Sequence, residues 1–249
     1  MNSWLRQRHF AQSPDHPITQ SLNRSITRFP GYNGAPPSFR IPMLQVRQIE
    51  CVRGNRRLFR NLSFRLGAKQ ALRVGGENGS GKTSLLRMVA GLSPVESGEI
   101  LWKEGRIAAS EEDFRRDLLF LGHANGLKDD LTPIENLRHA LALAGMNAGN
   151  AALRDALAEQ GLAGVADLPV KLLSQGQKRR VALARLGFSA DKPLWVLDEP
   201  FAALDTASVR RTEAVVLAHL SSGGMVLFTT HQEVEFAGAQ MQALELGAQ

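Results

Sequence analysis

The residues best suited to chemistry form a glycine-rich segment at 76–83, which reads Gly-Glu-Asn-Gly-Ser-Gly-Lys-Thr. This spacing fits the pattern G-x-x-x-x-G-K-[S/T], whose glycines let the backbone wrap a polyphosphate with its N–H groups pointing inward. In that pattern Lys82 reaches the β- and γ-phosphates, and the Thr83 hydroxyl holds Mg²⁺. A following helix adds the positive end of its dipole. We therefore predict an ATP site whose contacts are Gly76, Glu77, Asn78, Gly79, Ser80, Gly81, Lys82, Thr83 and Ser84.

Two carboxylates supply the second chemical feature. Asp198 and Glu199 come directly after the apolar run 194–197. A buried strand would deliver both side chains at its C-terminal end, where α/β sheets bind ligands. Asp198 is then placed to hold Mg²⁺ through water, and Glu199 to polarise the attacking water as a catalytic base. The alternative is an exposed acidic pair that ends a strand, and the phosphate loop upstream argues against it.

A third feature is the segment Leu173-Ser174-Gln175-Gly176-Gln177. It predicts a second helix N-terminus with a hydroxyl and a glycine, and therefore a second anion site. Two phosphate sites and one nucleotide per chain suggest a head-to-tail homodimer. The segment resembles the LSGGQ signature of ABC (ATP-binding cassette) ATPases, with Gln175 in place of the first glycine. In that family the signature of one protomer closes over the ATP that the other protomer holds.

The resemblance to the ABC family extends to further motifs, in the family's order. Residues 203–205 look like the D-loop, with its aspartate at Asp205. His231 follows Thr229 and Thr230 and matches the switch histidine that contacts the γ-phosphate. The resemblance thus implies that Glu199, His231 and Lys82 are the catalytic residues.

Two positions depart from the family pattern. The Q-loop glutamine is expected nine residues before Thr132, where this chain has His123. Histidine still binds water but adds pH sensitivity. The aromatic residue that stacks on adenine is expected before Gly54, where this chain has Arg53. A guanidinium can stack on a base, but Arg53 is equally interpretable as one more solvated charge in the segment 53–57.

The departures favour one subfamily. Segments 53–59 (RGNRRLF), 122–128, 198–201 (DEPF) and 229–232 (TTHQ) together resemble the haem exporter ATP-binding proteins of cytochrome c maturation, the CcmA family. The resemblance covers roughly residues 43–238. It implies that ATP hydrolysis drives integral membrane permease subunits of the CcmB and CcmC type, which move haem or release a haem-loaded chaperone. It also implies a peripheral protein on the cytoplasmic face of the bacterial inner membrane.

The elements that position these motifs alternate between strands and helices. Apolar alternation predicts strands near 44–46 and 64–66, and we expect a short strand at 70–74 that ends in glycines and further strands at 99–102 and 118–121. The short apolar runs 194–197 and 225–230 predict fully buried parallel strands. Thr132, Pro133 and Glu135 form a helix start with a capping box, and Ser174 with Gln177 forms another. We expect a P-loop α/β ABC cassette, with a parallel or mixed core sheet, antiparallel strands on its N-terminal side and an inserted helical subdomain at about 132–188.

The two ends of the chain read differently from this body. Residues 1–42 hold six prolines and lack sustained periodicity. They are a disordered extension, a targeting peptide, or an untranslated segment before a start at Met43, and we favour the last because periodic sequence begins there. The ATP-binding domain is expected over 43–240, followed by a C-terminal tail over 241–249.

Composition excludes some classes of protein. The formal net charge is +6, but residues 1–42 hold five arginines, one aspartate and no lysine, so the body carries only +2. The basic pI is therefore no sign of a nucleic-acid partner. The single cysteine, Cys51, excludes an internal disulfide. No uninterrupted apolar run of about 18 residues occurs, so we expect no membrane span in this chain.

Other functions stay open on the residues alone. A DNA-repair ABC protein would place a long coiled coil between phosphate loop and signature, and a ribosomal one would carry two cassettes; this chain shows neither pattern. Glu199 argues against a subunit that binds ATP without hydrolysing it. An ABC ATPase subunit for a different substrate is not excluded, because cargo contacts belong to other chains.

Overall fold

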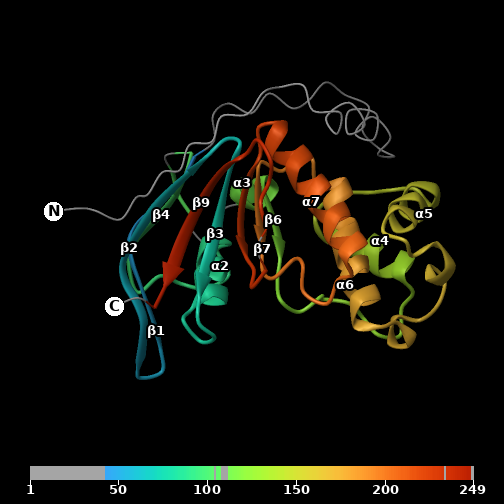
Figure 1. Ribbon diagram of the computed structural model, residues 1–249, viewed down its shortest axis with the longest axis horizontal. Helices are drawn as coiled ribbons and strands as arrows, with labels where there is room; N and C mark the ends of the chain where they lie inside the picture. Colours follow the sequence, from blue (N-terminus) through green and yellow to red (C-terminus); the bar gives the residue numbers. More distant parts are fainter. Residues whose placement is uncertain (1–42, 104, 108–111, 233, 248–249) are drawn as a thin grey trace.

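The computed structural model describes residues 43–103, 105–107, 112–232 and 234–247. The expected extension over residues 1–42 lies outside them. The described part contains two sheets and a group of helices, arranged in that order along the long axis of the molecule (Figure 1). No helix of the described residues is both long enough and apolar enough to cross a membrane.

The first sheet is antiparallel and comes almost entirely from the start of the described chain. Its strand order is β2-β1-β4-β5. The strands are β1 (Met43–Arg53), β2 (Arg56–Gly67), β4 (Ser97–Trp102) and β5 (Gly105–Arg106). Leu44 and Val46 of β1 are buried between more exposed neighbours, as their alternation predicts.

The second sheet is parallel and has the strand order β6-β7-β8-β3-β9. Its strands are β3 (Gln70–Gly76), β6 (Leu118–Leu121), β7 (Leu194–Leu197), β8 (Met225–Thr229) and β9 (Gln240–Leu246). Every residue of β7 and β8 is buried. Both faces of the sheet are therefore covered, which explains why these strands are uninterrupted apolar runs.

Consecutive residues of the central strands pack on opposite faces of this sheet. Leu194 and Val196 face a core shared with helix α2 (Lys82–Val89) and the antiparallel sheet. Trp195 and Leu197 face a second core, shared with α6 (Gln175–Leu183) and α7 (Thr206–Ser221). Helix α2 thus lies between the two sheets, where it carries the end of the phosphate loop.

The helical part has its own core. It contains α4 (Pro133–Leu143), α5 (Asn150–Glu159), α6 and the 3₁₀ turns η1 (Ala163–Val165), η2 (Val170–Leu172) and η3 (Ala184–Phe188). Helix α3 (Glu112–Asp117) lies apart, before β6. Thr132 and Ser174 cap α4 and α6 with complete capping boxes, so both predicted helix starts are confirmed.

The expected C-terminal tail is wrong over most of its length. Strand β9 pairs in parallel with β3 from Gln240 to Leu246, so the sheet continues past residue 240. Sequence pattern missed it because the segment QMQALEL is rich in residues that do not favour strands. The segment forms a strand because it pairs with β3 in the folded protein. A Cβ atom on Gly76 would lie 2.4 Å from the Leu246 carbonyl oxygen, so only glycine lets β9 approach the phosphate loop this closely.

Candidate functional site

Four segments that carry the predicted site residues start at one edge of the parallel sheet. The strands β3, β6, β7 and β8 run in the same direction, so their carboxyl ends lie together (Figure 1). The phosphate loop follows β3, His123 follows β6, Asp198 and Glu199 follow β7, and His231 follows β8. The fold therefore gathers residues that are up to 155 positions apart in the chain.

The phosphate loop has the backbone that a polyphosphate cradle needs. Gly76, Gly79 and Gly81 have φ angles of 128°, 80° and 104°, which side-chain-bearing residues rarely adopt. Gly81 caps α2 without a side-chain hydrogen bond, so the first N–H groups of that helix face the loop without a capping partner. The Lys82 ammonium donates to the carbonyl oxygens of Gly76 at 2.6 Å and Glu77 at 3.0 Å. The Lys82 ammonium group therefore lies against the backbone of the phosphate loop.

Thr83 and Asp198 meet at the predicted metal position. Asp198 is buried, and its Oδ2 atom accepts a hydrogen bond from the Thr83 hydroxyl at 2.9 Å. Both are hard oxygen ligands of the type that Mg²⁺ prefers. Within the described ranges, no group of three or more His, Cys, Asp or Glu side chains could enclose a metal ion by itself. This arrangement fits Mg²⁺ bound together with phosphate and water rather than a structural cation site.

Glu199 occupies an unusual backbone position beside Asp198. Its φ angle is 50°, in the left-handed region that non-glycine residues seldom occupy. Its side-chain Oε1 atom is buried without a hydrogen-bond partner among the described residues. The Nε2 atom of the more exposed His231 lies 3.5 Å from this oxygen, at ion-pair distance. The two side chains are therefore adjacent, as their predicted roles require.

Arg179 is a site residue that sequence reasoning missed. It projects from α6, is 3% exposed, and donates to the carbonyl oxygens of Asp198 at 2.7 Å and Glu199 at 2.8 Å. It also donates to the Gly122 carbonyl oxygen and to Asn125, both at 3.1 Å. Burial lowers its pKa below the ordinary arginine value, and the charges of Asp198 and Glu199 oppose that shift. The one sequence signal was the basic turn 178–180 after the signature.

The signature residues form the first turn of α6 and the residues just before it. The Ser174 hydroxyl accepts from the Gln177 N–H at 3.2 Å, and the Gln177 side chain accepts from the Ser174 N–H at 2.8 Å. Leu173 is buried, whereas Ser174 and Gln175 are exposed. Over the described ranges no hydrogen bond joins this turn to the phosphate loop of the same chain. The turn is therefore presented at the surface.

Asp205 has a local structural role. It caps α7, and its Oδ1 atom accepts from the Ser208 N–H at 2.7 Å. This hydrogen bond lowers the carboxyl pKa. The preceding residues 202–204 form the turn that connects Asp205 to Phe201 behind Glu199.

The two positions that depart from the family pattern lie at the surface. His123 is exposed in the loop after β6. Arg53 is exposed at the end of β1, and its guanidinium donates to the Ser93 hydroxyl at 3.4 Å. Within the part of the chain that the structure describes, neither side chain is hydrogen-bonded to the phosphate loop, and the adenine contact of Arg53 stays a prediction.

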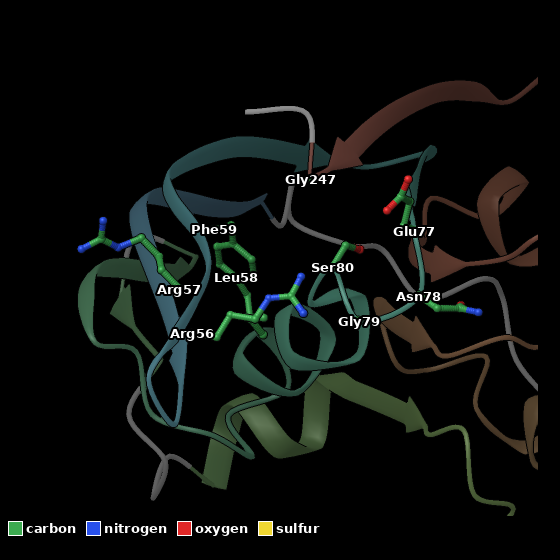
Figure 2. Close-up of a pocket in the computed structure, with 9 residues that line it drawn as sticks. All are labelled: Arg56, Arg57, Leu58, Phe59, Glu77, Asn78, Gly79, Ser80 and Gly247. Atoms are coloured by element: carbon green, nitrogen blue, oxygen red, sulfur yellow. The ribbon is translucent and has the colours of Figure 1, made fainter.

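A cavity of about 260 Å³ lies between β2 and the phosphate loop. It is lined by residues 56–59 of β2, residues 77–80 of the loop, and Gly247. Figure 2 shows the Arg56 side chain directed toward the loop and the Arg57 side chain directed away from it. The Ser80 hydroxyl is buried here without a hydrogen-bond partner among the described residues. The cavity therefore offers a cationic group and a free hydroxyl on one side of the loop.

Comparison with known proteins gives a consistent result. Residues 59–202 match the family model described as ABC transporter. The chain is 51% identical over 205 residues to the cytochrome c biogenesis ATP-binding export protein CcmA of Dechloromonas aromatica, covering 82% of this chain and all of the relative. It is 47% identical over 205 residues to the CcmA protein of Vibrio cholerae, covering 82% of this chain and 99% of that one.

Solved structures show the same fold. The dimeric ATP-binding cassette MJ0796, in a post-hydrolysis state with ADP and Pi, superposes with a TM-score of 0.68 at 22% identity, covering 82% of this chain and 96% of that one. A putative ABC transporter ATP-binding protein from Pyrococcus furiosus superposes with a TM-score of 0.67 at 21% identity, covering 82% and 97% of the two chains. The predicted fold class is thereby confirmed.

Proposed function

The chain belongs to the ABC transporter family and, within it, to the cytochrome c biogenesis ATP-binding export proteins (CcmA), and we propose that its ATP hydrolysis drives haem export for c-type cytochrome maturation. The work done is the movement of haem across the membrane or the release of a haem-loaded chaperone. The observation that carries the proposal is the contact of Thr83 with Asp198, with Glu199 beside it, on a chain 51% identical to a CcmA protein.

Residues of one chain bind the nucleotide. The loop residues 76–84 wrap the phosphates of ATP, whose negative charge the α2 N-terminus and Lys82 offset. Thr83 and Asp198 hold Mg²⁺, which shields the phosphate charge when it is bound. In this arrangement the Lys82 ammonium exchanges its carbonyl partners in the loop for phosphate oxygens.

Hydrolysis needs a base and a group that stabilises the developing charge. Glu199 accepts the proton of the attacking water, and its buried Oε1 atom has no hydrogen-bond partner among the described residues. His231, at 3.5 Å from that oxygen, faces the γ-phosphate side and stabilises its charge together with Lys82. Asp205 and the turn before it connect this centre to α7.

A second chain completes the site. The signature residues Leu173, Ser174, Gln175, Gly176 and Gln177 close over the ATP of the partner protomer in a head-to-tail homodimer. What supports this is the surface position of the α6 N-terminus and its lack of contact, within the described part of the chain, with its own phosphate loop. His123, exposed in the loop after β6, takes the Q-loop position.

The transport path itself belongs to other subunits. We assign the membrane path to integral permease subunits of the CcmB and CcmC type, because the chain is 51% identical to a cytochrome c biogenesis ATP-binding export protein. The chain then binds as a peripheral subunit on the cytoplasmic face of the inner membrane. Nucleic acid has no part in this function.

The haem assignment is tested in the native host with the variant Lys82→Ala. Loss of the Lys82 charge removes nucleotide affinity and transition-state stabilisation, so we expect covalent c-type haem attachment to disappear. Membrane b-type cytochromes, which need no covalent attachment, should persist. The control is Lys103→Ala, because Lys103 lies in the turn after β4 and pairs with Asp117 at the end of α3, before β6 rather than at the carboxyl end of that strand. Normal c-type haem staining with the Lys82 variant present at normal level would remove haem as the cargo.

A further inference from the structure

Thr229 lies on a central strand of the parallel sheet, beside Asp198 and Glu199. It is the last residue of β8, which lies between β7 and β3, and its side chain is fully buried. Its register partner on β3 is Val74, two residues before the phosphate loop. A hydroxyl at this depth needs hydrogen-bond partners to offset its loss of water.

Both partners of the Thr229 hydroxyl belong to the acidic pair. The Oγ1 atom lies 2.7 Å from Asp198 Oδ1, and the Glu199 N–H donates to the same Oγ1 atom at 2.8 Å. The hydroxyl has one proton, so it donates to the carboxylate and accepts from the backbone. One buried side chain therefore ties together the consecutive residues to which metal binding and proton abstraction are assigned.

The first consequence concerns the orientation of the Asp198 carboxylate. Its Oδ1 atom is held by Thr229, while its Oδ2 atom faces the Thr83 hydroxyl at 2.9 Å. With both oxygens engaged, the carboxylate plane cannot turn without losing a hydrogen bond. The oxygen on the Thr83 side is thereby kept toward the position assigned to Mg²⁺.

The second consequence concerns the strained backbone of Glu199. Its N–H donates to Thr229, and its carbonyl oxygen accepts from Arg179 at 2.8 Å. These two bonds hold the residue from both sides at a φ angle of 50°, which such a residue otherwise avoids. The direction of the Glu199 side chain depends on this backbone conformation.

We propose that Thr229 is a positioning residue for ATP hydrolysis, whose hydroxyl orients Asp198 toward the metal and fixes the backbone from which Glu199 reaches the attacking water. This rests on the proposed function insofar as Asp198 and Glu199 act on ATP. The Thr229 side chain is fully buried and its hydroxyl bonds to Asp198 and Glu199, so Thr229 acts through these two residues.

The proposal is tested with Thr229→Val, which keeps the shape and removes the hydroxyl, and with Thr229→Ser, which keeps the hydroxyl. The matched control is Thr212→Val, because Thr212 is also buried but its hydroxyl donates to the Ser208 carbonyl oxygen within α7 rather than to the acidic pair. We expect Thr229→Val to lower kcat by about 10- to 100-fold while KM for ATP changes less than about threefold. Thr229→Ser and Thr212→Val should stay within about threefold of the unaltered protein in kcat.

Binding measurements give a readout that does not need turnover. A fluorescent ATP analogue is titrated with and without Mg²⁺. We expect Thr229→Val to bind the analogue normally without Mg²⁺, but to need several-fold more Mg²⁺ for the metal-dependent part of binding. Thr229→Ser should need the same Mg²⁺ concentration as the unaltered protein. This pattern separates the orientation of Asp198 from a general loss of structure.

Two results would overturn the positioning role. One is a Thr229→Val protein whose kcat and Mg²⁺ requirement both match those of the unaltered protein. The other is a folded Thr229→Ser protein as impaired as Thr229→Val, since the hydroxyl would then be present without restoring hydrolysis. Failure of the haem assignment would instead appear as normal c-type cytochromes in the Lys82→Ala strain, which leaves the Thr229 measurements unaffected.

Discussion

The guanidinium of Arg179 donates to the carbonyl oxygen of Glu199 at 2.8 Å, although the two residues lie on different elements and 20 positions apart. The same guanidinium reaches the Asp198 carbonyl and the Gly122 carbonyl before His123. The helix α6, which begins with the proposed signature, is thus directly hydrogen-bonded to the backbone of Asp198 and Glu199. A shift of α6 would therefore move the Glu199 backbone or break its hydrogen bond to Arg179.

Replacing Arg179 by lysine should damage both stability and turnover. An ammonium cannot reproduce the planar fork that serves these separate acceptors, so buried carbonyl groups lose their partners at a cost of about 2 kcal/mol. We expect Tm to fall by about 4–8 °C and ATP hydrolysis by about tenfold or more. The control is Arg180→Lys, since Arg180 donates to the Gln160 carbonyl oxygen and to no other described residue. Equal, small effects of the two variants would contradict this prediction.

Replacing Glu199 by glutamine should separate binding from hydrolysis. The amide keeps the size of the side chain but cannot take a proton from water, so hydrolysis should fall by about 10²- to 10⁴-fold. ATP binding should persist, and an ATP-bound dimer should accumulate on gel filtration. Glu112→Gln is the control, because Glu112 is an exposed partner of Arg116 on α3. Phosphate release near the normal rate would remove Glu199 from the role of base.

Replacing Gly176 by alanine should lower the stability of the single chain as well as disturb the proposed contact with the partner protomer. A Cβ atom at this position would lie 2.6 Å from the Ala203 carbonyl oxygen, so α6 or the turn before Asp205 must shift. Such overpacking costs about 1–3 kcal/mol, and we expect Tm of the nucleotide-free protein to fall by about 3–10 °C. Gly164→Ala is the control, since nothing lies within 4 Å of its added Cβ. An unchanged Tm with reduced hydrolysis would assign Gly176 to the partner contact alone.

The arginines at 53 and 56 should differ in what they recognise. Arg53 occupies the position predicted to stack on adenine, whereas Arg56 is directed toward the phosphate loop (Figure 2). We expect Arg53→Ala to lower the affinity for ATP by about three- to tenfold but not the affinity for inorganic triphosphate. Arg56→Ala should lower both, because it removes a positive charge near the phosphates. Calorimetric titration measures all four affinities, and unchanged ATP binding by Arg53→Ala would exclude the adenine contact.

The buried His219 should make the protein sensitive to acid. Its ring stacks on Trp195 with 3.8 Å between centroids, and burial lowers its pKa to about 3. The unfolded chain takes up this proton below about pH 6.5, so stability is fully present above that pH and falls by about 1.4 kcal/mol per pH unit toward pH 3.

Urea unfolding at pH 7.5 and pH 5 measures this contribution. Between these pH values His219→Gln should lose about 2 kcal/mol less stability than the unaltered protein. His139→Gln, at an exposed histidine on α4, should keep the original pH dependence. Identical pH dependence in all three proteins would show that His219 does not titrate in this way.

The sequence by itself determined the features that depend on neighbouring residues. The phosphate loop, the start of α4 at Thr132 and the start of α6 at Ser174 each need only a few consecutive side chains, because turns and caps are closed by local hydrogen bonds. The apolar runs of β7 and β8 likewise predicted buried parallel strands. These patterns were sufficient to predict an ATP site with its acidic pair, and they predicted the class of fold that the structure confirms.

Only the tertiary structure decided which distant residues support that site. Strand β9 has no strand-like sequence and exists through its pairing with β3, while Arg179 read as one charge of a basic turn and Thr229 as one residue of a buried strand. Their roles come from the order of the parallel strands and the packing of α6, which bring carbonyls, hydroxyl and carboxylates within hydrogen-bond distance. A buried polar group needs a hydrogen-bond partner, and the fold can supply one from a residue far away in the sequence. The spacing of residues along the chain does not show which distant residue that will be.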